Sequence, residues 1–297
     1  MQPHHSVIDK SVNWDQLVDI GRIEARYARR SPEYAVVYLS SQTGCDQGCR
    51  MCHLTATGQT KLRDVTLEEF IKQADEVLAH YQHEAPPAKA IHFNFMARGE
   101  PLNNQTILTD ADTLLGDLAK RAGALNLRPR YLISTILPKT LGDRRLEDIF
   151  PVHHPEFYYS LYSMGDKFRQ KWLPKAMPVD DALDRLASWQ RNTYKICKIH
   201  YAFIAGENDS EEDIHAICDA LERRKLMAHI NIVRYNPADD KRGVESPELT
   251  IYRNITIYKA RLPYSRVTIV PRIGFDVAAS CGMFFRPDGS SPGVLPV

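Results

Sequence analysis

The sequence of 297 residues lacks several features that would assign it to a special class of protein. It contains no run of about 18 apolar residues, so we expect no membrane-spanning helix. Its N-terminal segment has no apolar core of a signal peptide, which predicts a cytoplasmic protein. Neither sign of charge is in excess, because 38 Lys and Arg against 37 Asp and Glu give a net charge of +1. This balance does not suggest a general, charge-driven nucleic-acid binder, and any RNA contact would need basic residues gathered on one face.

The composition is ordinary for a globular protein, with 43% hydrophobic and 25% charged residues. It excludes a disordered tail, a collagen and a small disulfide scaffold. The length suits about two domains or one α/β barrel, and it is sufficient to bury a large core.

Cysteine is scarce, but three of the six cysteines lie within eight residues. Cys45, Cys49 and Cys52 have the spacing C-x3-C-x2-C, and without an export signal this favours a metal or redox site over a disulfide framework. Three thiolates on a short loop can hold three corners of a cubane iron–sulfur cluster and leave the fourth iron open to a small molecule. The alternative is zinc, whose fourth ligand would come from far away because His53 directly follows Cys52.

Strand-like and helix-like stretches alternate along the chain. The apolar pattern predicts strands at 34–39, 89–96, 131–135, 156–162, 196–204 and 229–233, and a short final strand at 267–270. It predicts helices after a capping box of Thr66 and Glu69, over 105–122 and 179–191, after a cap at Ser210, and over 247–261. This alternation predicts an α/β fold with a parallel sheet of right-handed βαβ units.

Ligands of such folds bind at the carboxyl ends of the strands. The cysteine loop, Gly99–Glu100, Ser134–Thr135, Ser160–Tyr162 and Asn236–Pro237 all follow predicted strands. We therefore expect these segments to meet at one functional site.

Several segments between about residue 22 and residue 284 match, in order, the motifs of one enzyme family. SSQTGCDQGCRMC is similar to SSQ-x-GC-x3-C-x2-C, ARGEPLNN to GMGEPL, and FIAGENDS to GVNDS. The segment from Arg272 to Gly282 is similar to R-G-x-D-I-x-A-A-C-G and is more specific than the cysteine triplet. The chain thus resembles the radical SAM adenine methyltransferases RlmN and Cfr. These enzymes methylate carbon 2 or carbon 8 of an adenine in 23S rRNA, and carbon 2 of an adenine in some tRNAs.

The resemblance implies a radical SAM partial (β/α)6 barrel with parallel strands. Residues 1–32 would be a short N-terminal extension, and residues 33–297 a radical SAM core with a C-terminal segment that carries Cys281. The implied reaction is methylation of an RNA adenine at carbon 2 through an S-methylcysteine intermediate. The implied cofactors are a [4Fe–4S] cluster and S-adenosyl-L-methionine (SAM).

The resemblance also assigns roles to individual residues. Cys281 would carry the methyl group, and Glu24 would be an acid or base. The cluster ligands would be Cys45, Cys49 and Cys52. The SAM-binding residues would be Gly99, Glu100, Ser134, Ser160, Leu161, Tyr162 and Asn236. From composition alone, Glu24 would instead form a surface ion pair, because it lies among Arg22, Arg26, Arg29 and Arg30.

The sequence departs from the family pattern in three places. Tyr38 stands where the family has a second cysteine, which helps resolve the enzyme–RNA adduct and ends in a disulfide with the carrier cysteine. Either Cys197 or Cys218 takes its place, or the adduct is resolved differently. Only 44 residues precede Cys45, too few for the family's N-terminal RNA-docking domain. Arg98 and Tyr162 replace the usual Met and His beside the SAM site.

The expected partners are an RNA substrate, rRNA or tRNA, and a flavodoxin-type electron donor by analogy with the superfamily. The protein is expected to be a monomer without a membrane partner. One alternative is a radical SAM enzyme of altered chemistry or substrate on the same scaffold, which the replacement of a thiol by Tyr38 motivates. Another is a non-catalytic descendant that binds RNA or a metal.

Overall fold

The computed structural model describes residues 1–292, and ten strands form one continuous sheet in this part of the chain. Each strand pairs with the strands that precede and follow it in sequence. The strands are β1 (Gln2–His5), β2 (Val12–Leu17), β3 (Arg22–Ser31), β4 (Tyr34–Leu39), β5 (Ala90–Phe95), β6 (Arg128–Thr135), β7 (Glu156–Ser160), β8 (Cys197–Tyr201), β9 (Ala228–Val233) and β10 (Val267–Val270).

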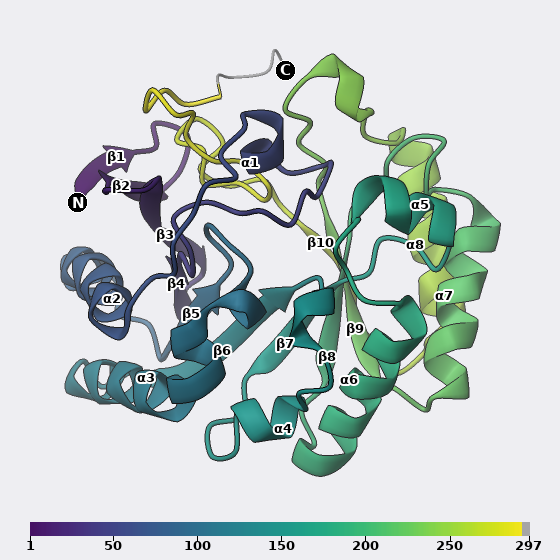
Figure 1. Ribbon diagram of the computed structural model, residues 1–297, viewed down its shortest axis with the longest axis horizontal. Coiled ribbons are helices and arrows are strands. Elements are labelled where there is room, and N and C mark those ends of the chain that lie inside the picture. The colour runs from purple at the N-terminus through teal and green to yellow at the C-terminus, as the bar shows by residue number, and fades with distance from the viewer. Residues whose placement is uncertain (293–297) are drawn as a thin grey trace.

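The strands from β4 to β10 are all parallel, which confirms the predicted α/β class and the partial barrel. Figure 1 shows the strands fanning around the centre, with the long helices outside them. The helices are α1 (His53–Ala56), α2 (Leu67–Tyr81), α3 (Gln105–Ala124), α4 (Leu146–Ile149), α5 (Asp166–Trp172), α6 (Val179–Thr193), α7 (Glu211–Arg223) and α8 (Glu248–Arg261). The capping box of Thr66 and Glu69 and the cap at Ser210 are both present.

The N-terminal extension is more regular than the sequence suggested. The strands β1, β2 and β3 pair in antiparallel fashion with one another and with β4, and so extend the barrel sheet. The charged sequence of β3, RIEARYARRS, is typical of a solvated face, yet its first seven residues are buried. Opposite charges that neutralise one another inside the protein explain why local hydrophobicity did not predict this strand.

The two faces of the parallel strands differ in polarity. Apolar side chains such as Phe93, Ile133 and Ile199 point outward and join the core beneath the helices. Their sequence neighbours His92, Ser134 and Lys198 line a cavity inside the barrel instead. Successive side chains of a strand point to opposite faces, so this alternation leaves the interior polar and open rather than filled.

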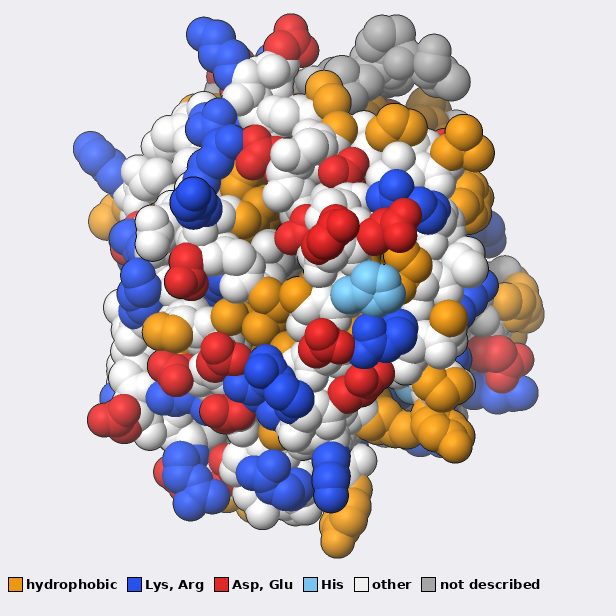
Figure 2. All heavy atoms as spheres, turned by 90° about the vertical axis from the view of Figure 1, so that its right-hand side faces the viewer, with side chains coloured by type: hydrophobic (Ala, Val, Ile, Leu, Met, Phe, Trp, Pro, Cys, Tyr) orange, Lys and Arg blue, Asp and Glu red, His pale blue; other side chains and the backbone are white. Residues whose placement is uncertain are grey.

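The outer surface has no dominant charge on the face shown in Figure 2, where basic and acidic side chains are intermixed. This agrees with the net charge of +1. Within the described residues, no helix combines the length and hydrophobicity needed to cross a membrane.

Candidate active site

The loop after β4 gathers Cys45, Cys49 and Cys52 immediately before α1. The backbone N–H of Cys52 donates to the carbonyl of Cys49 at 3.0 Å, which closes the loop into a tight turn. Gly44 lies so close to the carbonyl of Lys61 that a Cβ would be 2.3 Å from its oxygen. The loop can therefore take this shape only with glycine at position 44.

The three thiols lie close enough to influence one another. Burial raises the pKa of the Cys49 thiol, and negative charge on Cys45, Cys52 and Glu100 raises it further. Among residues 1–292, however, no three Cys, His, Asp or Glu side chains surround one point closely enough to bind a single metal ion. A zinc site needs that arrangement, whereas a cubane cluster binds each thiolate through a different iron atom. Three cysteine thiols on one short loop are a donor set that fits a cubane cluster.

Glu100 lies beside this loop, at the carboxyl end of β5, and is 4% exposed. Its carboxylate accepts hydrogen bonds from the hydroxyl of Thr135 at 2.7 Å and from the backbone N–H groups of Leu102 and Ile136, both at 3.1 Å. Burial raises the pKa of Glu100 to about 7, although these hydrogen bonds lower it. No cation pairs with Glu100 among residues 1–292, and a buried carboxylate of this kind is suited to receive an ammonium group.

The residue before it, Gly99, has φ of +93°, and a Cβ there would be 2.6 Å from the backbone nitrogen of Gln42. Gly99 thus allows the β5 loop to pack directly on the segment that leads to the cysteines. This close approach explains why glycine occupies position 99.

The other predicted SAM-binding residues lie at the ends of the neighbouring strands. Ser134 at the end of β6 lines the barrel cavity, and Leu161 after β7 is fully buried in the core. Tyr162 follows in the left-handed region with φ of +56°. Burial raises the pKa of Tyr162, and negative charge on Cys281 and Cys49 raises it further, so this residue lies close to both thiols. Ser160, the last residue of β7, pairs with His200 of β8.

The C-terminal segment brings Cys281 to the cysteine loop. The backbone N–H of His53 donates to the carbonyl of Gly282 at 3.1 Å, so a hydrogen bond joins the residue after Cys52 to the residue after Cys281. Cys281 itself is exposed and lines the barrel cavity, together with Gly282. Contact between segments so distant in sequence places one accessible thiol beside three clustered ones.

Asn236 helps to hold this segment in place. Its side-chain nitrogen donates to the carbonyl of Cys281 at 2.9 Å, and its side-chain oxygen accepts from Nε of Arg272 at 2.7 Å. Its backbone carbonyl lies 3.1 Å from Nε2 of His53. Both ends of the Asn236 amide are therefore occupied by the C-terminal segment.

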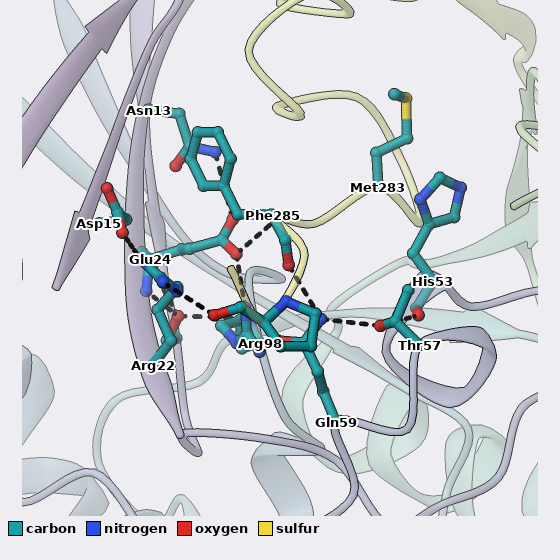
Figure 3. Close-up of polar contacts among 12 residues, drawn as sticks. Asn13, Asp15, Arg22, Glu24, His53, Thr57, Gln59, Arg98, Met283 and Phe285 are labelled. Carbon is teal, nitrogen blue, oxygen red and sulfur yellow. Dashed lines mark hydrogen bonds and ion pairs between the residues drawn. The ribbon is translucent and has the colours of Figure 1, made fainter. Parts of the chain in front are cut away.

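Glu24 is the centre of a buried ionic network (Figure 3). Its carboxylate pairs with Arg98 at 2.7 Å and with Arg26 at 2.9 Å, and it is fully buried. It also accepts from the side chain of Asn13 at 3.2 Å and from the backbone N–H of Phe285 at 3.2 Å. Burial by itself raises the pKa of Glu24, but the two arginines and Asn13 outweigh it and hold the pKa below the usual value.

This network corrects the expectation of a surface ion pair at Glu24, because both arginine partners are buried with it. The network also joins the site together. Arg26 donates to the carbonyl of Met283 at 2.7 Å, and Arg98 donates to the side chain of Gln59, which follows α1. Glu24 does not line the barrel cavity. Sequence analysis missed Gln59 and His53 because neither belongs to a recognisable motif.

The cavity inside the barrel has a volume of about 650 Å³ and reaches Cys281. Tyr38 lines it and accepts a hydrogen bond from Nη2 of Arg30 at 2.9 Å. Neither Cys197 nor Cys218 lines it, since both are buried in the core between sheet and helices. These two cysteines therefore do not replace the thiol that the family has at the position of Tyr38.

Known proteins identify the family of this chain. A probable dual-specificity RNA methyltransferase RlmN of Parafrankia sp. is 31% identical over 279 residues, covering 89% of this chain and 69% of that protein. The chain belongs to the RlmN/Cfr family of radical SAM RNA methyltransferases. The cofactors of this family are SAM and a [4Fe–4S] cluster.

Two other relatives agree with this assignment. A probable RlmN of Alkaliphilus oremlandii is 26% identical, covering 84% of this chain and 68% of the relative. A ribosomal RNA large subunit methyltransferase Cfr of Lachnoclostridium phytofermentans is 26% identical, covering 90% and 74%. No model of a known protein family matches the chain.

Solved structures have the same fold. A radical SAM methyltransferase from Sphaerobacter thermophilus superposes with a TM-score of 0.77 at 21% identity, covering 95% of this chain and 80% of that one. A structure described as native anSMEcpe with bound AdoMet superposes with a TM-score of 0.54 at 12% identity, covering 80% and 64%.

Proposed function

We propose that this protein methylates carbon 2 of an adenine in RNA and that Cys281 is the methyl carrier. The observation that carries the proposal is the hydrogen bond between His53 and Gly282, which brings the exposed thiol of Cys281 to the cysteine loop. RNA as the substrate is supported by relatives named as RNA methyltransferases, and carbon 2 by the relatives named RlmN.

The ligands of the cluster are Cys45, Cys49 and Cys52 in this proposal. Their thiols are free, close together and partly buried, which suits iron–sulfur ligation. When bound, the cluster supplies the electron for reductive cleavage of SAM.

Glu100 is proposed to hold the amino group of SAM through a charge-assisted hydrogen bond. Gly99 lets the β5 loop come close to the cysteine segment, while Ser134 and the backbone from Ser160 through Leu161 to Tyr162 form the adjoining strand ends. For Asn236 we propose a positioning role, because its amide holds the backbone of Cys281.

Two arginines lie near the carrier thiol. The cavity walls around the thiol raise the pKa of Cys281 by limiting its hydration, and the positive charges of Arg30 and Arg26 oppose that effect. Arg26 also fixes the backbone on either side of Cys281, through the carbonyls of Ser280 at 3.5 Å and Met283 at 2.7 Å. Glu24 orients Arg26, and we propose that it positions the carrier segment; the acid or base role stays a prediction.

A flavodoxin-type electron donor, a monomeric state and a cytoplasmic location complete the proposal. The electron donor is proposed by analogy with the superfamily and the location from the RNA substrate, and each of the three is open to separate measurement.

Nucleoside mass spectrometry tests the reaction. The reconstituted holoenzyme is incubated without oxygen with SAM, a reductant and RNA that lacks the modification, and the RNA is then digested. We expect 2-methyladenosine. If SAM is cleaved to 5′-deoxyadenosine but no methyladenosine forms, the proposed reaction is wrong and the alternative of altered chemistry or substrate replaces it.

Iron analysis tests the ligand assignment independently of activity. Cys45→Ser should lose most of the bound iron and sulfide, while Cys218→Ser, a matched change of a cysteine outside the site, should retain them. Equal iron content in the two variants would contradict the assignment.

A further inference from the structure

The barrel cavity extends from Cys281 toward the amino ends of the strands, into a part that the proposed reaction does not use. We call this part the lower chamber. It lies at the amino ends of the strands and is lined by Arg130, Glu156, Tyr158, Lys198, His229 and Arg266. Barrel interiors of this size are usually filled by apolar side chains. An open, polar chamber therefore needs an explanation.

Positive charge is in excess in the lower chamber. Its one carboxylate, Glu156, pairs with Arg130 and lies 3.3 Å from Lys198. No ion pair within residues 1–292 involves the third cation, Arg266. One acidic group thus faces three basic groups inside a partly enclosed space.

Two histidines on the cavity wall have lowered pKa values, with burial as the main cause and the nearby positive charges as a smaller one. Burial lowers the pKa of His92 to about 4, and the charges of Arg130 and Lys198 contribute. Burial lowers the pKa of His200 to about 3, with contributions from Lys198 and Arg30. Both histidines are therefore neutral near pH 7 and can exchange hydrogen bonds with a ligand without adding charge.

A phosphate group suits this chamber better than a carboxylate or a neutral ligand. Nε and Nη2 of Arg130 already bond to Glu156, so Arg266 offers the planar pair of donors that matches two phosphate oxygens, and Lys198 adds a point charge. Low-dielectric walls strengthen the attraction relative to bulk water. Aromatic faces are present as well, because Tyr34 and His92 stack with ring centroids 4.2 Å apart.

The length of the cavity along β4 indicates how such a ligand would lie. Tyr38 and Tyr34 line the same cavity from one strand and are four residues apart, which corresponds to about 13 Å along β4. That length exceeds what one base occupies. Proteins read single-stranded RNA by splaying bases out of the stack, and the flanking phosphates then follow the base into the protein.

We propose that the lower chamber binds a phosphate group next to the target adenine, through Lys198, Arg130 and Arg266. This inference rests on the proposed function, since it places the modified base at Cys281. It adds a phosphate site at the base of the barrel, away from the cluster and SAM.

The test compares AMP with adenosine, because the two ligands differ only by the phosphate. Calorimetry measures both dissociation constants on the holoenzyme with saturating SAM and no reductant, so that neither ligand occupies the SAM site. We expect the wild type to bind AMP about tenfold more tightly than adenosine, as one charge-assisted contact contributes.

Lys198→Met and Arg266→Met should each bring the ratio of the two constants close to one. Lys259→Met removes the same charge from an exposed position on α8 and should leave the ratio unchanged. Thermal unfolding identifies any variant that fails to fold. If Lys198→Met does not fold, Arg266→Met still tests the site, because Arg266 is exposed just before the start of β10. A wild-type ratio near one, or a ratio that survives both variants, would refute the site.

A second arm separates RNA phosphate from free phosphate. The trinucleotide ApApA should displace AMP more effectively than inorganic phosphate does. If inorganic phosphate displaces AMP and ApApA does not, the chamber serves a free anion and the proposal is wrong. Methylation is scored separately by nucleoside mass spectrometry, so failure of the reaction and failure of the phosphate site give different results.

Discussion

Replacing Glu24 with glutamine should destabilise the protein strongly, although the two side chains have nearly the same shape. Glutamine keeps one acceptor oxygen but removes the negative charge that Arg98 and Arg26 share at 2.7 and 2.9 Å. The Arg98 side chain is 0% exposed and that of Arg26 is 3% exposed. Two guanidinium groups would then remain buried without a counter-charge.

The size of the effect follows from that burial. Breaking a buried ion pair by removing one partner costs about 3–5 kcal/mol in the free energy of unfolding. At roughly 2 °C per kcal/mol for a chain of this size, Tm should fall by about 6–10 °C. Arg98→Met in the Glu24→Gln background removes one of the two orphaned charges and should restore roughly 1–2 kcal/mol.

The pH dependence provides a second measurement. The folded-state pKa of Glu24 is below its unfolded value, so its contribution is complete above the unfolded pKa and is lost as pH falls through the folded pKa. The difference in stability between wild type and Glu24→Gln should therefore be largest near pH 7 and should shrink in acid, below about pH 4.

Denaturant titration and thermal scans of the two variants and the wild type measure these differences. A loss below about 1 kcal/mol for Glu24→Gln would refute the reasoning, since that value is typical of an exposed pair. The absence of any rescue by Arg98→Met would show that the buried charges are not the cause.

Three further changes test the site. Cys281→Ala should retain iron and still cleave SAM but transfer no methyl group to RNA, and unchanged RNA methylation would remove its carrier role. Tyr38→Cys should form a disulfide with Cys281 under mild oxidation, detected by peptide mass spectrometry, because both positions line the same cavity. The matched control is Tyr34→Cys, about 13 Å away toward the amino end of the same strand, which should form no disulfide with Cys281. Equal cross-linking of the two variants would contradict this geometry. Gly99→Ala should lower both Tm and iron content, because its Cβ would lie 2.6 Å from Gln42, and unaltered stability would show that the loop can move aside.

Local sequence patterns determined a large part of this fold. The helix of residues 67–81 and the strands β4 to β10 follow from apolar periodicity, caps and turn residues, which act over a few neighbouring positions. The meeting of the cysteine loop with Glu100, Ser134 and Tyr162 could also be predicted. Parallel strands place their carboxyl ends at one edge of the sheet whatever the side chains are.

Only the tertiary structure decided how the charged and polar residues are used. Nothing near Glu24 in sequence distinguishes a solvated ion pair from a buried one, because its decisive partner, Arg98, is 74 residues away. Likewise, the bond between His53 and Gly282 and the occupied amide of Asn236 join segments that no local pattern relates. Burial converts such long-range contacts into strong constraints, because a charge or a polar group taken out of water must find its partner inside the fold.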